Sequence, residues 1–154
     1  MAGHDRLTDE GKRFFAQIKE LEQLQVRVGF QAGEAAEKDG VDIANIAMWN
    51  EVGTSRAPSR PFMRKSVDEN TDKITALCQS QVKRLARGAT AQEILQQIGV
   101  VMKGLVQDKI RDGDFKPNAP STIRKKKSDH PLIASSRMRQ SVSFVIKPKG
   151  EGDD

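Results

Sequence analysis

The chain has few of the residues that build a large core or a covalent framework. Tyrosine is absent, tryptophan and cysteine occur once each, and aromatic residues make up 5% of the 154 residues. A lone cysteine excludes an internal disulfide and a thiolate metal cluster. Hydrophobic residues make up only 36% of the chain, which is lean for a free-standing globule. We therefore expect partner subunits to bury some of the apolar surface.

Long hydrophobic runs are also missing. No apolar segment approaches the roughly 18 residues of a membrane span, and no basic segment followed by an apolar one marks a secretory signal. We expect a protein that stays in the cytoplasm, or in an assembly made there, and does not contact a membrane. The length predicts a single domain over 1–154 with flexible ends at 1–8 and 148–154.

The residue patterns of common catalytic sites are absent as well. Neither His4 nor His130 has neighbours in sequence that suit a metal site or a catalytic triad. No glycine-rich phosphate loop or zinc-binding spacing occurs. We expect no enzymatic activity, cofactor or metal. A small hydrolase or toxin stays as a hypothesis that requires a pocket holding an acid or base with a strongly shifted pKa.

Positive charge is concentrated in one segment. The formal net charge is +5, but residues 116–149 hold nine basic residues against the single acid Asp129. That segment therefore carries +8 and the rest of the chain −3. Such a segment indicates a polyanion or an acidic protein as its partner. We expect residues 113–133, which overlap the first part of this segment, to form a long basic loop.

Apolar spacing and capping residues predict the elements of the first half. Apolar residues recur at helical spacing over 9–23, and alternation over 25–30 predicts a half-buried strand. Asp42 is positioned to cap a short helix that ends near Val52, with Gly53 as its C-terminal stop.

Two long helices and a final strand are predicted in the second half. An apolar stripe begins at Pro61 and continues to residue 86 as one helix. Within it, Cys78 is expected to be buried. A capping-box pattern precedes a second helix over 91–112, and the short connection predicts an antiparallel hairpin. The alternation over 142–147 predicts a strand.

These elements define the expected fold class. It is α+β, with a small antiparallel sheet packed against a long antiparallel helix hairpin plus an N-terminal helix. The strand near 25–30 is expected to pair with the strand near 142–147, because these are the only two segments with a good strand pattern. Whether a third strand adds to an edge of this sheet is left open. A two-stranded sheet is marginal alone, so helices or a neighbouring chain must cover it.

The connection between the short helix and the first long helix has an unusual composition. Residues 53–62 combine one glycine, two prolines, three hydroxyl residues and two arginines. This composition excludes a helix interior or a central strand. We interpret the segment as a shaped loop with sharp ends.

Several short blocks occur in a fixed order along the chain. They are Val26-Arg27-Val28-Gly29-Phe30, Trp49-Asn50-Glu51-Val52-Gly53-Thr54, Pro58-Ser59-Arg60-Pro61-Phe62-Met63-Arg64, Phe115-Lys116-Pro117-Asn118-Ala119-Pro120-Ser121-Thr122-Ile123-Arg124-Lys125-Lys126, Pro131-Leu132-Ile133 and Arg137-Met138-Arg139-Gln140-Ser141-Val142. Their order and spacing resemble those of phage virion-morphogenesis proteins, the neck, head-tail joining and tail-completion proteins of long-tailed phages. Ser136 and Phe115 depart from the glycine and tryptophan usual in that pattern.

The resemblance implies a structural virion protein located at the neck, where head and tail join. Its expected partners are further copies of itself in a ring, expected to be a hexamer, together with head-side adaptor or portal-connector proteins and tail-side terminator or tube proteins. Non-specific contact with DNA in the lumen is compatible with this position. We interpret the loop after the short helix as the subunit or ring docking loop, formed by Glu51, Gly53, Thr54, Arg56, Arg60, Pro61 and Phe62. The basic partner or lumen loop comprises Lys116, Arg124, Lys125, Lys126 and Lys127.

A second hypothesis uses the same positive charge differently. The basic segment 116–149 can serve as a sequence-independent nucleic-acid-binding module that contacts phosphates. No aromatic residue interleaves with its lysines, so stacking on single-stranded bases is not indicated. Its signature is duplex binding that weakens steeply with salt and is reduced by replacing Lys125, Lys126 and Lys127 with alanine.

Overall fold

A computed structural model describes residues 7–31, 33, 40–112 and 136–150. Within these residues the fold mixes helix and strand and is mostly helical. The helices are α1 (Asp9–Gln23), α2 (Ile43–Val52), α3 (Phe62–Asp68), α4 (Thr71–Ala86), α5 (Ala91–Asp112) and α7 (Ser136–Gln140), and the strands are β1 (Leu24–Gly29) and β2 (Ser143–Pro148). None of the described helices is long and apolar enough to cross a membrane.

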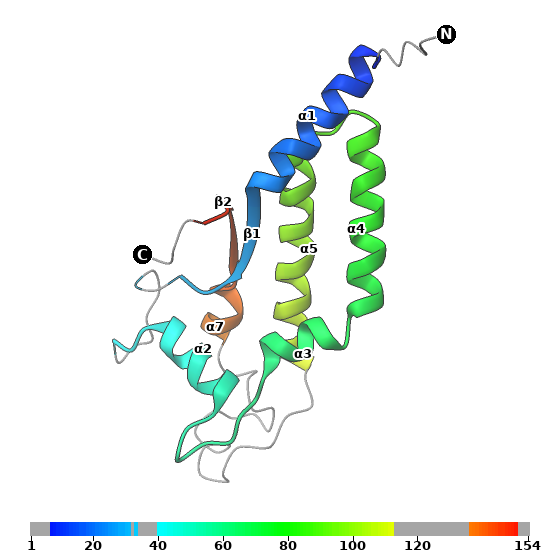
Figure 1. The fold of residues 1–154 in the computed structure, drawn as a ribbon. Helices are drawn as coiled ribbons and strands as arrows, with labels where there is room; N and C mark the ends of the chain where they lie inside the picture. Colours follow the sequence, from blue (N-terminus) through cyan, green and yellow to red (C-terminus); the bar gives the residue numbers. More distant parts are fainter. Residues whose placement is uncertain (1–6, 32, 34–39, 113–135, 151–154) are drawn as a thin grey trace.

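Helix α5 is the centre of the fold. It contacts α1, α3, α4, α7 and both strands. Figure 1 shows α4 and α5 running antiparallel beside each other, while α1 crosses the end where they are joined. The Gln17 side-chain oxygen accepts a 2.8 Å hydrogen bond from the Ala91 N–H, so α1 caps the first turn of α5. Thr90 accepts from Glu93 N–H at 3.1 Å, as the capping-box pattern predicts.

The two strands form an antiparallel pair whose register runs from Leu24 opposite Pro148 to Gly29 opposite Ser143. The expected pairing of these segments is therefore confirmed. The pair packs against α5 at Gly99, where a methyl group would lie 2.3 Å from the Phe144 ring. Only glycine permits this close approach of strand to helix.

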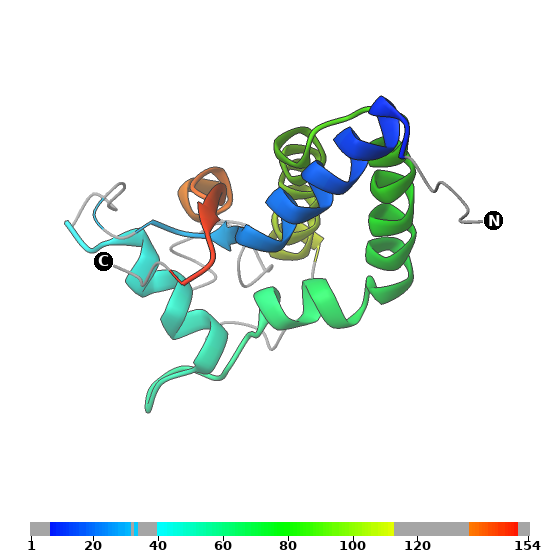
Figure 2. The same cartoon turned by 45° about the horizontal axis from the view of Figure 1, so that its top comes forward.

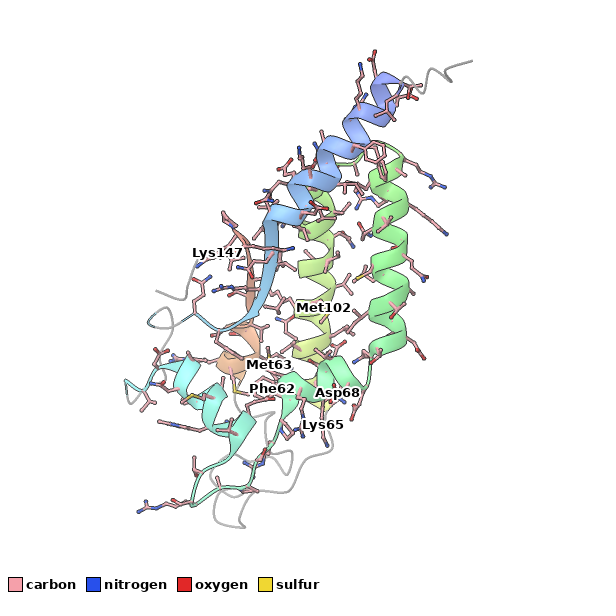
Figure 3. All side chains as sticks on the ribbon, viewed as in Figure 1. Phe62, Met63, Lys65, Asp68, Met102 and Lys147 are labelled. Atoms are coloured by element: carbon pink, nitrogen blue, oxygen red, sulfur yellow. The ribbon has the colours of Figure 1, made fainter. Side chains whose placement is uncertain are left out.

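The main core lies where α2, α3, α5 and α7 meet. Its buried members are Ile43, Ala47, Phe62, Val106, Ile110, Met138 and Val142. Val28 and Phe30 pack against this cluster from β1 and the residue after it, and the rings of Phe30 and Phe62 meet edge to face at 6.0 Å. Figure 3 shows Phe62 and Met63 where α3 begins, near the lower end of α5.

The prediction of a single long helix from Pro61 to residue 86 is wrong, because α3 ends at Asp68 and α4 begins at Thr71. The Asn70 side chain donates to the Ser66 carbonyl at 2.7 Å, and the Thr71 hydroxyl donates to the Asp68 carbonyl at 3.1 Å. These side chains bond the carbonyls that end α3, so the helix does not continue. A hydrogen bond from Lys109 of α5 lowers the pKa of Glu69 and ties the break to the central helix.

A further expectation is corrected. Cys78 is exposed rather than buried, because α4 buries only Gln81 and Leu85 along its length. Two residues near the ends of the chain are placed in regular structure. Thr8 caps α1 by accepting from the Gly11 N–H at 3.0 Å, and Pro148 belongs to β2.

Candidate docking surface

The loop 53–61 begins with a backbone conformation that excludes side chains. Gly53 has φ 79° and ψ 169°, a region that is essentially restricted to glycine. A Cβ atom here would lie 2.8 Å from the Ser59 nitrogen and 3.3 Å from the Ala57 oxygen. The glycine therefore turns the chain out of α2 and also lets the returning segment pass close to it. This is the C-terminal stop that the sequence predicts.

Hydrogen bonds inside the loop close it on itself. The Thr54 N–H donates to the Ala57 carbonyl at 2.9 Å. In return, the Thr54 hydroxyl accepts from the N–H groups of Arg56 and Ala57 at 3.2 and 3.1 Å. A threonine that bonds the backbone two and three residues ahead fixes a tight turn. Residues 54–57 are therefore a defined turn, from which the Arg56 side chain extends into solvent.

The returning half of the loop is attached to the end of α2. The Ser59 hydroxyl donates to the Glu51 carbonyl at 2.8 Å, and the Arg60 N–H donates to the Asn50 carbonyl at 2.6 Å. These carbonyls belong to the last turn of a helix, where no intrahelical N–H is available. The loop thus satisfies the helix end, and both are held in one arrangement.

Glu51 links the same helix end to the start of α3. Its two carboxylate oxygens accept hydrogen bonds from the N–H groups of Met63 at 2.8 Å and Arg64 at 3.0 Å. A carboxylate at a helix N-terminus satisfies free donors and complements the helix dipole. Pro61, which occupies the cap position, has no side-chain acceptor to offer. Glu51 supplies the missing cap from twelve residues earlier in the chain.

The structure divides the residues predicted to form the docking loop. Phe62 is fully buried, and Arg60 is 6% exposed, where burial lowers the pKa of its guanidinium. Glu51, Gly53 and Pro61 are partly buried and shape the backbone. Among the seven, the exposed positions are Thr54 and Arg56. The side chains of Phe62 and Arg60 thus belong to the interior of this chain and do not form its outer surface.

The outer face of α2 was not identified from the sequence as part of this surface. Met48, Trp49 and Val52 point away from the core and are 53%, 45% and 67% exposed. We call these three side chains the α2 face. The opposite face of the same helix buries Ile43 and Ala47. Apolar residues thus occupy both faces of α2, whereas a surface helix normally confines them to the face that packs on the core. This distribution is the signal in the sequence that could have identified the α2 face.

The basic partner or lumen loop predicted at Lys116 and 124–127 lies outside the described residues. Of the same basic segment, Arg137 and Arg139 in α7 and Lys147 and Lys149 at the end of the chain are described. Figure 3 shows Lys147 on the strand pair, away from α4.

Two of the cavities lined by described residues present no reactive pair. One, of about 350 Å³, lies between α1 and the turn joining α4 to α5, and its ionisable groups are Glu10, Arg13 and Arg87. The other, of about 230 Å³, has Lys103 as its ionisable group beside two serines. Within the described ranges no three histidine, cysteine or carboxylate side chains gather as a metal site would require.

Comparison of the chain with protein-family models, curated proteins and solved structures finds no match.

Proposed function

We propose that this chain is a structural protein of the phage neck, forming a ring that joins head and tail. The order of its sequence blocks, which resembles that of virion-morphogenesis proteins, suggests the family. The observation that carries the proposal is the α2 face beside loop 53–61. Large apolar side chains are exposed next to a loop whose backbone is already fixed, and a surface that is ordered before binding loses little entropy on docking.

The chemistry of this surface favours a protein partner over a substrate. Tryptophan, methionine and arginine are enriched in protein interfaces. Trp49 and Met48 are exposed on α2, and Arg56 is exposed on the loop that follows it. The surface offers no nucleophile paired with a base. We therefore propose no enzymatic activity, and we propose the virion neck as the location, with head-side adaptor or portal-connector and tail-side terminator or tube proteins as neighbours.

Gene deletion in the phage or prophage that carries the gene tests this function. We expect filled heads and complete tails to accumulate separately, and purified protein added to the mixture to restore joined, infectious particles. A normal yield of infectious particles without the gene would contradict the proposal.

A surface variant sharpens the experiment. Trp49→Ser removes the largest exposed apolar side chain and should abolish restoration while the protein stays folded. Lys73→Ser, an exposed change on α4, is the matched control and should restore joining fully. Duplex DNA binding at low salt, measured on the same preparations, distinguishes the nucleic-acid-binding hypothesis, which predicts binding that does not depend on Trp49.

A further inference from the structure

A second uncharged surface lies on α4. Thr75, Cys78 and Val82 are exposed and recur at three- and four-residue spacing, so they share one side of the helix. Val82 is 50% exposed. We call these three side chains the α4 flank. The positions around them on that side are also uncharged and exposed: Thr71, Gln79 and Ala86.

The two surfaces differ in shape in a complementary way. The α2 face carries large side chains, whereas the three side chains of the α4 flank are small. Large side chains can pack into the shallow surface that small residues leave on a helix, as ridges pack into grooves. Trp49 and Met48 are thus matched to a surface that the same chain provides.

Their positions exclude contact within one chain. Figures 1 and 2 both place α2 and α4 on opposite sides of the molecule, with the strand pair and α5 between them. A contact between two different surfaces must then join separate copies head to tail. Such a contact leaves one free surface at each end of a dimer, so further copies can be added, and a ring forms where the rotation between neighbours closes.

Charge at the edges of the two surfaces is complementary. Arg56 is exposed on loop 53–61, close to the end of α2. Asp68 and Asp72 are exposed where α3 passes into α4, at the N-terminal end of the α4 flank. Opposite charges at an interface edge set its register and disfavour incorrect pairings.

We propose that the α2 face of one copy docks on the α4 flank of the next, with Arg56 placed against Asp72. The inference rests on the ring assembly proposed above and specifies the two surfaces that form it. Trp49 would be buried at the centre of this contact, and tryptophans in that position are typical of the residues that dominate binding energy.

Cysteine cross-linking tests the contact, because Cys78 is the only cysteine and lies on the α4 flank. Met48→Cys adds a thiol to the α2 face. Under mild oxidation we expect a ladder of covalent dimers, trimers and larger species, since each copy then carries both partners of the bond. Met48→Cys with Cys78→Ser should lose the ladder. Ala16→Cys, at an exposed position on α1, is the control and should give no ladder.

The other possible patterns would overturn the proposal. Dimers of Met48→Cys that persist after Cys78→Ser would indicate an α2-to-α2 contact. Dimers through Cys78 in the unmodified chain would indicate an α4-to-α4 contact. A monomer without cross-links at high protein concentration would rule out self-association through these surfaces.

Charge reversal gives an independent measurement of the register. Arg56→Asp should weaken self-association about tenfold, measured by analytical ultracentrifugation, and adding Asp72→Arg should restore it. Failure of the double variant to recover would contradict the Arg56 placement. If these contacts fail while gene deletion still leaves heads and tails unjoined, the inference is wrong and the proposed function stands. Normal particle yield without the gene, together with a full ladder, would contradict the proposed function, while the contact between the α2 face and the α4 flank would stand.

Discussion

Loop 53–61 and helix α4 are held in opposite ways. The loop has no regular secondary structure, yet hydrogen bonds from its backbone and its hydroxyl groups attach it to itself and to the end of α2. Helix α4 spans 16 residues of regular helix but buries only Gln81 and Leu85. The irregular segment is therefore the one more fully tied to its surroundings.

The difference shows that regular backbone and fixed position are separate properties. The backbone hydrogen bonds of α4 lie within the helix and do not attach it to the rest of the fold. Tertiary packing supplies most of the stability of a helix in a protein, and few buried apolar contacts indicate low local stability. We infer that α4 is the part of the chain best able to gain from contact with another copy.

Breaking the loop at its first residue should have the largest effect. Gly53→Ala introduces a side chain where φ is 79° and where the Ser59 nitrogen would lie 2.8 Å away. Backbone strain and the clash together should lower the free energy of unfolding by about 3 kcal/mol. Chemical denaturation of the purified protein measures this change.

Gly40→Ala is the matched control. Gly40 has a similar φ of 84°, but a methyl group added there would have no atom within 4 Å. It should carry the conformational cost alone, about 1 kcal/mol. Equal losses in the two variants would mean that the loop contact at Ser59 contributes nothing, and the loop would then be no better held than an open turn.

Local signals made the element ends predictable from the sequence. Helix α1 has the predicted bounds, and the caps Asp42 and Gly53 close α2 as predicted. Each of these signals acts within about four residues, which is the range over which caps and apolar spacing operate. The break between α3 and α4 was missed, because Asn70 continues the three- and four-residue spacing of Val67 and Ile74, so the stripe predicts one unbroken helix.

Long-range features of the candidate site were not predictable in the same way. Apolar spacing in α4 identifies a stripe but not whether another element covers it, so Cys78 was wrongly predicted to be buried. The Glu51 carboxylate reaches the start of α3 from 12 residues earlier in the chain, and no local motif marks such a bond. The close contact of Gly99 with Phe144 depends on two segments that meet only in the folded chain.

The link from Glu51 to α3 should have an intermediate effect. Glu51→Ala leaves the Met63 and Arg64 N–H groups without their acceptor and should cost about 1.5 kcal/mol of unfolding free energy. Glu51→Gln keeps one acceptor oxygen and should recover roughly half of this loss. Thermal unfolding of the three proteins at one pH measures the order. A Glu51→Ala variant as stable as the unmodified chain would show that α3 does not depend on α2 for its cap.

The smallest effect is expected on α4. Val82→Ala removes two methyl groups from a side chain that is 50% exposed, so it should change the unfolding free energy of the dilute monomer by less than about 0.5 kcal/mol. Leu85→Ala, nearly one turn along and 1% exposed, is the control and should cost about 3 kcal/mol. Repeating both measurements at rising protein concentration distinguishes the exposed side of α4, which carries Val82, from the buried side, which carries Leu85. The cost of Val82→Ala should grow with concentration if a second copy covers the α4 flank, because association stabilises only the folded chain, whereas the cost of Leu85→Ala is already complete within the monomer. A large and concentration-independent cost at Val82 would mean that α4 is held as firmly as loop 53–61.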